Sequence, residues 1–271
     1  MLAAPDMRAV ESLLAFWAEA GVEASYADAP IDRLAEGAAL LKARQAPPPP
    51  PPIQMAGRVS AAPQTGAGIA AAKQAAAAAN TLEELSAAIT AFEGCSLKLE
   101  GARQAVFSRG NPEAPLMIIG EAPGADEDRE GAPFVGRAGK LLDRMIAAAG
   151  LSDRVFITNT VFWRPPGNRT PSPAEQAVCA PFVERAVALV KPKMLLLAGG
   201  ASAKSILKTS EGILSMRGRW FEWTPEGGGE TLPAMPTLHP AFLLRQPAAK
   251  KKAWTDLLTL SERLDRLGRP G

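Results

Sequence analysis

Along residues 81–271, short apolar runs typical of strands alternate with longer segments whose apolar residues have helical spacing. Short apolar runs predict buried strands within 114–120, 155–163, 193–200 and 234–240. Stretches with apolar residues at helical spacing predict helices within 81–94, 136–151, 172–190, 201–207 and 246–264. Such alternation is typical of a parallel sheet with helices on both faces. We therefore expect an α/β fold, a three-layer αβα sandwich around a mostly parallel four-stranded sheet.

The first 80 residues follow a different pattern. Residues 1–45 predict one or two helices, because "MRAVESLLAFWAEAGV" has apolar residues at helical spacing. Residues 46–80 hold the proline run Pro47–Pro52 and an alanine-rich stretch, which predict a linker that is disordered in part. The alanine-rich stretch is either a solvated helix or has no fixed structure. We thus divide the chain into an N-terminal helical extension (1–45), a Pro/Ala-rich linker (46–80) and the α/β domain (81–271). The extension is either structural or dispensable, or it docks on a protein partner.

Composition narrows the class of protein only partly. The net charge of +2 and a pI of about 8.6 neither require nor exclude a local basic surface for nucleic acid. The two cysteines form no Cys-x-x-Cys pair, so neither a disulfide scaffold nor a four-cysteine metal site is supported, and free thiols suit a reducing cytoplasm. We find no signal peptide and no apolar run near the roughly 20 residues of a membrane span. We expect a cytoplasmic protein that does not bind membranes.

Three distinctive stretches follow predicted strands. They are "GEAPGADEDREGAPFVGRAG" (120–139), "TNTVFWRPPGNR" (158–169) and "LHPAFLLR" (238–245). Ligands of parallel α/β sheets bind beyond the carboxyl ends of the strands, so we expect these stretches to share one site. The first lacks the G-x-G-x-x-G spacing of a dinucleotide loop. In "GGASAKS" (199–205), Ala203 stands where a phosphate loop needs glycine, so neither nucleotide motif is supported.

Several side chains in these stretches suit a flat heterocycle bound to nucleic acid. Phe134 can form one wall of a slot, although its acidic loop can equally be a solvated turn. Asn159 ends a strand, and its amide either offers one donor and one acceptor to a ligand or caps a turn. His239 is the only histidine, and it is either catalytic or packed in the core.

Basic and apolar residues near these groups suit contact with DNA. A loop stiffened by prolines presents Arg164, Asn168 and Arg169, which suit phosphates, although a pair of arginines is commonly just a solvated surface. Leu243 and Leu244, expected on a loop or turn, are followed by Arg245 and the basic run 250–252. An apolar wedge with basic neighbours is how proteins enter a base stack.

Together the three stretches resemble the uracil-DNA glycosylase superfamily, and most closely its family 4. The first matches Gly-Glu-x-Pro-Gly followed by Pro-Phe-Val-Gly, the second Thr-Asn…Arg-Pro-Pro-x-Asn-Arg, and the third His-Pro-Ala…Leu-Arg, over about residues 90–262. The resemblance implies a monomeric, nucleoid-associated DNA repair enzyme that acts on uracil-containing DNA, single- or double-stranded. Such an enzyme flips uracil out, hydrolyses its N-glycosidic bond and leaves an abasic site. The alternative is a non-catalytic protein on the same fold that binds uracil or abasic DNA.

The resemblance also assigns roles. Phe134 stacks on the flipped uracil, Asn159 reads its edge, and His239 donates a hydrogen bond to O2 as the leaving uracil becomes an anion. Glu121 is the first candidate to position the water, followed by Asp126 or Asp128. Two further positions adjoin the uracil: Ala122, where the best-known branch has aspartate, and Gly124, near that branch's thymine-excluding tyrosine. The implied DNA contacts are Leu243 or Leu244 as the wedge and Arg164, Asn168, Arg169 and Arg245 at phosphates.

The chain differs from the family pattern at the positions that bind a cofactor. Family 4 enzymes usually carry an iron–sulfur cluster on four cysteines, of which Cys95 matches the first and Cys179 the last. The other two positions are Lys98 and Trp163. Two thiolates cannot hold a four-iron cluster in the usual way. We therefore predict no metal and no other cofactor, with Trp163 filling the space by apolar packing.

Overall fold

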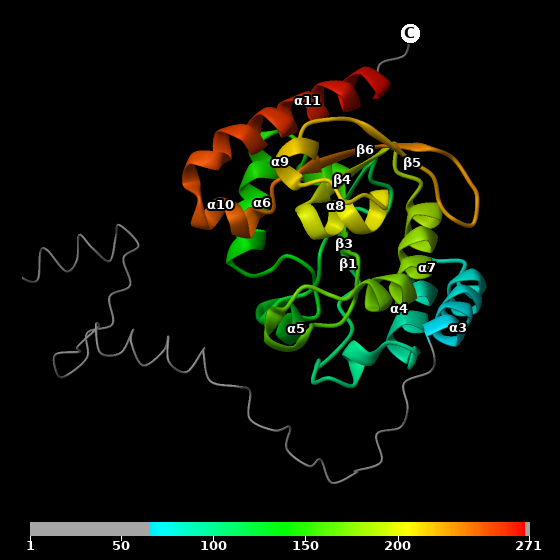
Figure 1. Cartoon of the computed structure of the whole chain (residues 1–271). Helices are drawn as coiled ribbons and strands as arrows, with labels where there is room; N and C mark the ends of the chain where they lie inside the picture. The colour runs from blue at the N-terminus through cyan, green and yellow to red at the C-terminus, as the bar shows by residue number, and fades with distance from the viewer. Residues whose placement is uncertain (1–64, 269–271) are drawn as a thin grey trace, which may run out of the picture. The chain divides into compact units, whose positions relative to one another are not determined.

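The computed structural model describes residues 65–268, which form one sheet covered by helices (Figure 1). The helical extension (1–45), its expected protein partner and the first part of the linker concern residues outside this range. The strands are β1 (Ser108–Gly110), β2 (Leu116–Gly120), β3 (Val155–Asn159), β4 (Met194–Ala198), β5 (Phe221–Trp223) and β6 (Leu232–Thr237). The α-helices are α3 (Thr65–Ala78), α4 (Leu82–Ala91), α5 (Ala125–Glu130), α6 (Arg137–Ala148), α7 (Pro173–Val190), α8 (Gly200–Leu207), α9 (Ile213–Met216), α10 (Pro240–Arg245) and α11 (Lys250–Gly268). Short 3-10 turns span Ser96–Lys98, Ser152–Arg154, Pro166–Asn168 and Pro247–Ala249.

The sheet has six strands in the order β1-β3-β2-β4-β6-β5. The predicted four-stranded parallel sheet is confirmed as its centre, because β3, β2, β4 and β6 pair in parallel. The two edge strands, β1 and β5, were not predicted; they pair antiparallel with β3 and β6 and make the sheet mixed. The carboxyl ends of the four parallel strands therefore lie along one edge.

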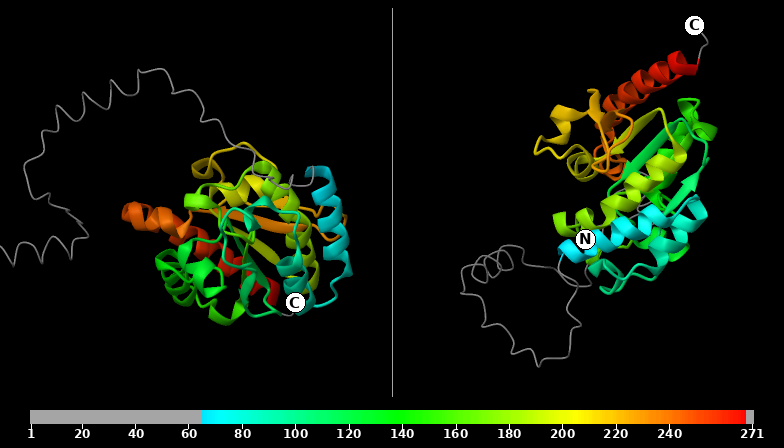
Figure 2. Two further views of the ribbon diagram at one scale, coloured as in Figure 1. Left: turned by 90° about the horizontal axis from the view of Figure 1, so that it is seen from below. Right: turned by 90° about the vertical axis from the view of Figure 1, so that its right-hand side faces the viewer.

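Helices cover both faces of the sheet, which confirms the three-layer arrangement (Figures 1 and 2). Successive side chains of a strand point to opposite faces. In β2, Met117 and Ile119 pack in the apolar cluster that includes α3, α4 and α7. Leu116 and Ile118 pack in the cluster that includes α6 and α11. A strand buried on both faces reads as a continuous apolar run, which is the pattern that predicted β2.

Helix α3 is packed in the core, whereas its residues were expected in a linker that is disordered in part. Its residues Ala72 and Ala76 are buried in the main core cluster, and α3 packs along α7. The small side chains of α3 let the two helices approach closely: a Cβ atom placed on Gly68 would lie 3.4 Å from Val178 Cγ2. Arg185 Nε also donates a hydrogen bond of 2.7 Å to the carbonyl oxygen of Ala79. Residues 65–80 thus belong to the α/β unit, and the expected boundary at residue 81 would cut into it.

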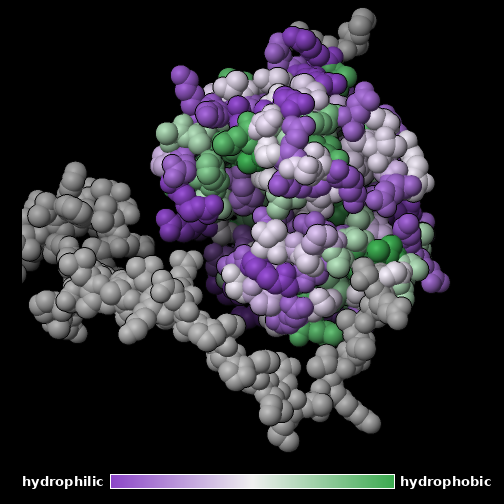
Figure 3. Space-filling model, in the orientation of Figure 1, coloured by the Kyte–Doolittle hydropathy of each residue, from purple (hydrophilic) through white to green (hydrophobic). Residues whose placement is uncertain are grey.

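The surface is mixed in polarity. Figure 3 shows one face of the molecule, on which hydrophilic and neutral residues are interspersed with small hydrophobic patches. Among residues 65–268, no helix combines the length and the apolar character that a membrane crossing needs.

Candidate active site

The three distinctive stretches meet at a cavity of about 470 Å³ beyond the carboxyl ends of the parallel strands. A volume of this size lies within the usual range for small-molecule sites. The cavity brings together many of the residues singled out in the sequence: Glu121, Ala122, Gly124, Phe134, Asn168, Arg169, His239 and Arg245. The sequence analysis did not single out the lining residues Glu127 and Phe242 for this site.

Asn159 lies at the end of β3, directly opposite Gly120 of β2 in the parallel register. A Cβ atom on Gly120 would lie 2.3 Å from Asn159 Oδ1 and 2.5 Å from Phe134 Cε2. Only glycine at position 120 therefore allows the amide and the ring to come together. The side chain of Asn159 is 1% exposed, and its Oδ1 has no hydrogen-bond partner among the described residues. A buried acceptor without a partner is costly, so this oxygen favours a ligand that donates an N–H.

Phe134 occupies a backbone conformation that few residues with side chains adopt. Its φ of 55° lies in the left-handed region, which costs about 1–3 kcal/mol for a residue other than glycine. Arg109, on the edge strand β1, holds this conformation by donating to two carbonyls, from Nε to Pro133 O (2.7 Å) and from Nη2 to Phe134 O (3.1 Å). Arg109 Nη2 also pairs with Asp143 at 2.6 Å. Arg109 was not predicted as a site residue, because a three-residue edge strand leaves no hydrophobic pattern in the sequence.

His239 is the N-cap residue of α10, and its Nδ1 accepts a hydrogen bond of 3.1 Å from the backbone N–H of Ala241. Burial and the nearby Arg245 lower the pKa of His239 from 6.5 to about 4, while Glu127 opposes that shift. The imidazole is therefore neutral at neutral pH. Because Nδ1 is an acceptor, the ring proton is on Nε2. The ring centroid lies 5.7 Å from that of Phe134, with 30° between the planes.

Gly199, which follows β4, keeps the histidine in place. It has a φ of 99°, and a Cβ atom at this position would lie 2.9 Å from His239 Cβ. Its backbone N–H donates to the carbonyl oxygen of Thr237, two residues before the histidine. Gly199 thus has a steric role, because the absence of a side chain there leaves room for the imidazole.

Two carboxylates of the acidic loop line the cavity, Glu127 and Glu121, and only Glu127 accepts hydrogen bonds from the backbone of the loop. Glu127 accepts hydrogen bonds from the backbone N–H groups of Gly124, Val135 and Gly136 at 2.9–3.0 Å, and so joins the two ends of the loop. Glu121 lines the cavity, and its carbonyl oxygen accepts a hydrogen bond from the hydroxyl of Thr160.

Asp126 and Asp128, the alternative candidates to position the water, bind other protein groups. Asp126 pairs with Arg129 at 2.8 Å, and Asp128 is buried and accepts a hydrogen bond from the backbone N–H of Arg103. Neither lines the cavity. Of the three candidates, Glu121 alone lines the cavity.

The expected wedge needs a correction. Residues 240–245 form helix α10, not a loop, and Leu243 is fully buried among Leu141, Leu238 and Ala253. A buried leucine cannot enter a base stack without unfolding α10, so the expectation for Leu243 is wrong in this structure. Leu244 is partly exposed on the same helix, and Arg245 is exposed and lines the cavity.

The proline-stiffened loop is partly held by its own polar groups. Arg164 Nε donates a hydrogen bond of 2.7 Å to Asn168 Oδ1. Arg169 makes a bidentate ion pair with Glu175, with N–O distances of 2.7 and 2.9 Å, and a further pair with Glu100 at 3.1 Å. Arg169 lowers the pKa of Glu175 to about 2. The guanidinium of Arg169 is therefore already neutralised from within the protein.

The residues at the four cluster positions do not fit an iron–sulfur cluster. The sulfur atoms of Cys95 and Cys179 are 4.0 Å apart and hydrogen-bonded, which leaves no room for an inorganic core between them. Trp163 is 1% exposed and packs in the same core cluster as both cysteines. The ammonium of Lys98 donates to the carbonyl oxygens of Thr90 and Phe92 and pairs with Glu93.

Among the residues that the structure describes, no group of three or more His, Cys, Asp and Glu side chains is placed to hold a metal ion.

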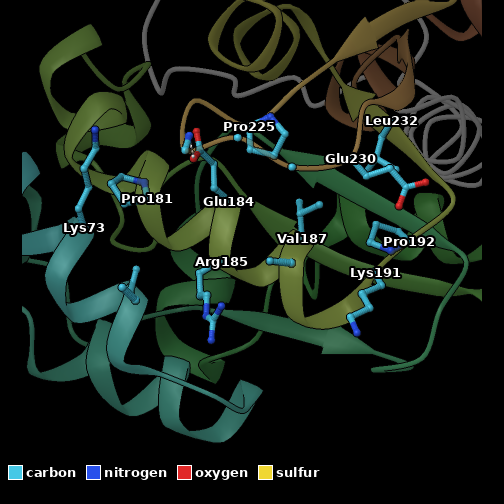
Figure 4. A pocket seen from close by; sticks show the side chains of 16 residues that line it. Lys73, Pro181, Glu184, Arg185, Val187, Lys191, Pro192, Pro225, Glu230 and Leu232 are labelled. Carbon is cyan, nitrogen blue, oxygen red and sulfur yellow. Dashed lines mark hydrogen bonds between the residues drawn. The ribbon is translucent and has the colours of Figure 1, made fainter.

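A second, larger cavity of about 600 Å³ lies between α3, α7 and the connection from β5 to β6 (Figure 4). Its lining includes Lys73, Arg185 and Lys191, with Glu184 and Glu230 as the acidic members. Glu184 is used structurally, because it accepts a hydrogen bond from the backbone N–H of Gly227. This cavity contains none of the residues that the sequence analysis singled out.

The fold is an α/β sandwich whose cavity beyond the parallel strands has an aromatic ring and a neutral imidazole in its lining and a buried amide beside that ring. The family model of the uracil DNA glycosylase superfamily matches residues 107–258, which contain all three groups. The chain belongs to this superfamily.

Individual relatives support family 4. The Type-4 uracil-DNA glycosylase of Sulfurisphaera tokodaii is 36% identical over 189 residues, covering 68% of this chain and 84% of the relative. That of Saccharolobus solfataricus is 40% identical over 168 residues, covering 60% and 77%. The Type-5 uracil-DNA glycosylase of Thermus thermophilus is 33% identical over 119 residues, covering only 38% and 54%. The expected resemblance to family 4 is confirmed.

Proposed function

We propose that this chain is a DNA repair glycosylase that flips uracil out of DNA, hydrolyses its N-glycosidic bond and leaves an abasic site. The observation that carries this proposal is that Phe134 and His239 line one cavity beyond the parallel strands, with the buried amide of Asn159 beside the Phe134 ring. The names of the Type-4 relatives support the same activity. A glycosylase must extrude its base, because the glycosidic carbon is inaccessible inside a stacked duplex.

The side chain of Asn159 selects the base. Its unpartnered Oδ1 accepts the N3–H of uracil, while its amide N–H donates to O4. Cytosine presents the opposite pattern, an acceptor at N3 and a donor at C4, and would leave the buried oxygen without a partner. The ring of Phe134 stacks on the base. Ala122 and Gly124 line the remaining wall, so exclusion of thymine depends on the shape of this wall.

His239 stabilises the leaving group. As the bond from the sugar to uracil breaks, negative charge develops on the base and on its O2. The Nε2–H of the neutral imidazole donates to that oxygen, and the hydrogen bond strengthens only as the charge develops. Since Ala241 occupies Nδ1, the imidazole is fixed in the tautomer that this step requires.

The departing uracil leaves an oxocarbenium-like sugar, to which water adds. Glu121 is the carboxylate of the acidic loop that lines the cavity, and we assign it to position this water. The oxocarbenium-like carbon is strongly electrophilic, so a water that is held in place without full deprotonation is sufficient. No metal or other cofactor is needed for this chemistry.

The bound DNA spans α10 and the proline-stiffened loop. Leu244 replaces Leu243 as the residue that fills the vacated stack, because it is the one with an exposed surface. Arg245, Arg164 and Asn168 lie on the two segments that flank the cavity and suit phosphate contacts. Preference for single- or double-stranded DNA, the monomeric state and the cytoplasmic, nucleoid-associated location stay predictions.

The proposal is tested with three end-labelled oligonucleotides that are identical except for a single uracil, cytosine or thymine. Each is incubated with the full chain and then treated with alkali, which breaks DNA at abasic sites. We expect cleavage at uracil alone. Asn159→Asp offers an extra acceptor in place of the amide donor and should lower cleavage at uracil. A wild-type chain that retards uracil DNA on a gel without cleaving it would instead identify a binding protein.

A further inference from the structure

The four positions that hold a cluster in family 4 map onto three segments of this chain. Cys95 and Lys98 lie in residues 95–100, Trp163 begins the stretch 163–170, and Cys179 lies in α7. A cluster bound at those positions would tie the three segments together. The same three segments are joined here by other means.

The joining group is Arg169. Its two terminal nitrogens hold Glu175 of α7 in a bidentate pair, and Nη2 also reaches Glu100. Glu175 is 7% exposed, and it accepts a further hydrogen bond from the hydroxyl of Ser96 at 3.4 Å. One guanidinium thus contacts carboxylates from the first and third segments while belonging to the second. A planar guanidinium is suited to such bidentate pairing.

The residues that bind Arg169 lie next to the two cysteines of the cluster pattern. Glu175 precedes Cys179 by one helical turn of α7, and Ser96 follows Cys95 directly. Glu175 is also the capping-box residue of α7, where its Oε2 accepts from the backbone N–H of Ser172. The capping hydrogen bond therefore positions the Glu175 carboxylate independently of Arg169.

We propose that Arg169 is a positioning residue, which anchors loop 164–170 to Glu175 and Glu100 in place of an iron–sulfur cluster and does not bind a phosphate. The inference rests on the proposed function in one respect: the anchored loop is one that faces DNA. Arg164 is partly exposed and Asn168 exposed on this loop, whereas Arg169, which also lines the cavity, has its guanidinium held by two carboxylates.

The two roles for Arg169 predict opposite results for Glu175→Gln. Glutamine keeps the capping hydrogen bond but loses the charge. If Arg169 is an anchor, Glu175→Gln loosens the loop, weakens binding of DNA and lowers the melting temperature. If Arg169 is a phosphate contact, releasing it from Glu175 strengthens binding. Binding is measured with an uncleavable strand that carries 2′-fluoro-2′-deoxyuridine.

Salt dependence gives a second test. The plot of log K against log salt has a negative slope, and each lost phosphate contact reduces its magnitude by about 0.9 for duplex DNA. We expect Arg169→Gln to weaken binding several-fold with an unchanged slope, and Arg169→Lys to recover part of the loss. A slope reduced by about 0.9 in Arg169→Gln would overturn the proposal. Arg266→Gln is the matched control, because Arg266 forms an exposed ion pair with Glu262 at the far end of α11.

Stability tests the anchor independently of catalysis. Arg169→Gln, Glu175→Gln and the double variant should lower the melting temperature non-additively, whereas Arg266→Gln should not change it. Additive effects would contradict a shared anchor, and so would stoichiometric iron in the purified wild-type protein. If the wild type fails to excise uracil, the proposed function falls, while these unfolding measurements still decide the role of Arg169.

Discussion

The Nδ1 atom of His239 accepts a hydrogen bond from the backbone N–H of Ala241 at 3.1 Å. This one contact determines which nitrogen carries the proton, because an atom that accepts from an N–H cannot itself be protonated. Burial, which is the main cause of the lowered pKa, removes the second proton at neutral pH. These two effects together leave one N–H donor, at Nε2, as the leaving-group role proposed for His239 requires.

We predict that His239 titrates with a pKa of about 4 and is the Nε2–H tautomer at pH 7. Because the chain contains one histidine, its imidazole signals in a ¹⁵N-labelled sample are assigned without ambiguity. Nitrogen chemical shifts recorded from pH 7.5 to the acid limit of the fold give both quantities. A midpoint near 6.5, or a proton on Nδ1, would contradict the described geometry.

The same pKa predicts how stability depends on pH. The folded pKa of His239 lies below its ordinary value of 6.5, so the unfolded chain binds more protons between the two values. The contribution of this group is complete above pH 6.5 and is lost as the pH falls from 6.5 to about 4. Denaturant unfolding of wild type and His239→Gln should therefore show wild type losing stability relative to the variant over that window.

Gly120→Ala is expected to lower uracil excision about 100-fold or more. The added Cβ atom would lie 2.3 Å from Asn159 Oδ1 and 2.5 Å from Phe134 Cε2, so both groups that hold the base must move. Displacement of a positioned group by about 1 Å can cost a factor of 100. Single-turnover rates measure the effect. Gly212→Ala is the control, since nothing lies within 4 Å of its Cβ atom, and equal rates for the two variants would refute the argument.

Arg109→Gln is expected to lower excision about tenfold, or about 1.4 kcal/mol in the activation barrier. The variant removes the guanidinium that holds the Pro133 and Phe134 carbonyls, and so frees Phe134 from its left-handed conformation. Asp143→Asn is the matched variant, because it breaks the ion pair but leaves the bonds to the carbonyls. If both substitutions have the same effect, Arg109 acts through Asp143 and not through Phe134.

Two truncations test the place of α3 in the fold. A chain that begins at Thr65 keeps α3 against α7, whereas one that begins at Thr81 exposes the apolar face of α7. We expect the first to melt at the temperature of the intact chain and the second roughly 5–10 °C lower, as a loss of a few kcal/mol implies for a chain of this size. Equal melting temperatures for the two truncated chains would mean that residues 65–80 add no stability, as expected for a linker that ends at residue 80.

Much of the fold was predictable because its central strands are buried on both faces. A strand such as Leu116–Gly120 is apolar throughout, and it is flanked by helices with a clear apolar spacing. The edge strands β1 and β5 have three residues each, too few to show a period. The burial of α3 was missed for another reason: alanines that look solvated in a sequence are buried once α7 lies beside them.

The site was predictable as far as its chemistry lies in local motifs. Phe134, Asn159 and His239 follow strands and were expected to meet. Arg109, by contrast, acts on residues 24 and 25 positions away, and Arg169 reaches Glu100 69 positions away. Such pairings depend on tertiary structure and leave no pattern in the sequence. The wrong expectation for Leu243 has the same origin, because its burial depends on α6 and α11.

The most direct test of the account is the single-turnover rate of uracil excision by wild type and His239→Ala. The same uracil-containing oligonucleotide is used at saturating enzyme, so that binding does not limit the rate. We predict excision by the wild type and a loss of roughly 100- to 1000-fold in the variant, the usual effect of removing a hydrogen bond to a developing anion. Equal rates would remove His239 from the chemistry and contradict the mechanism proposed for this site.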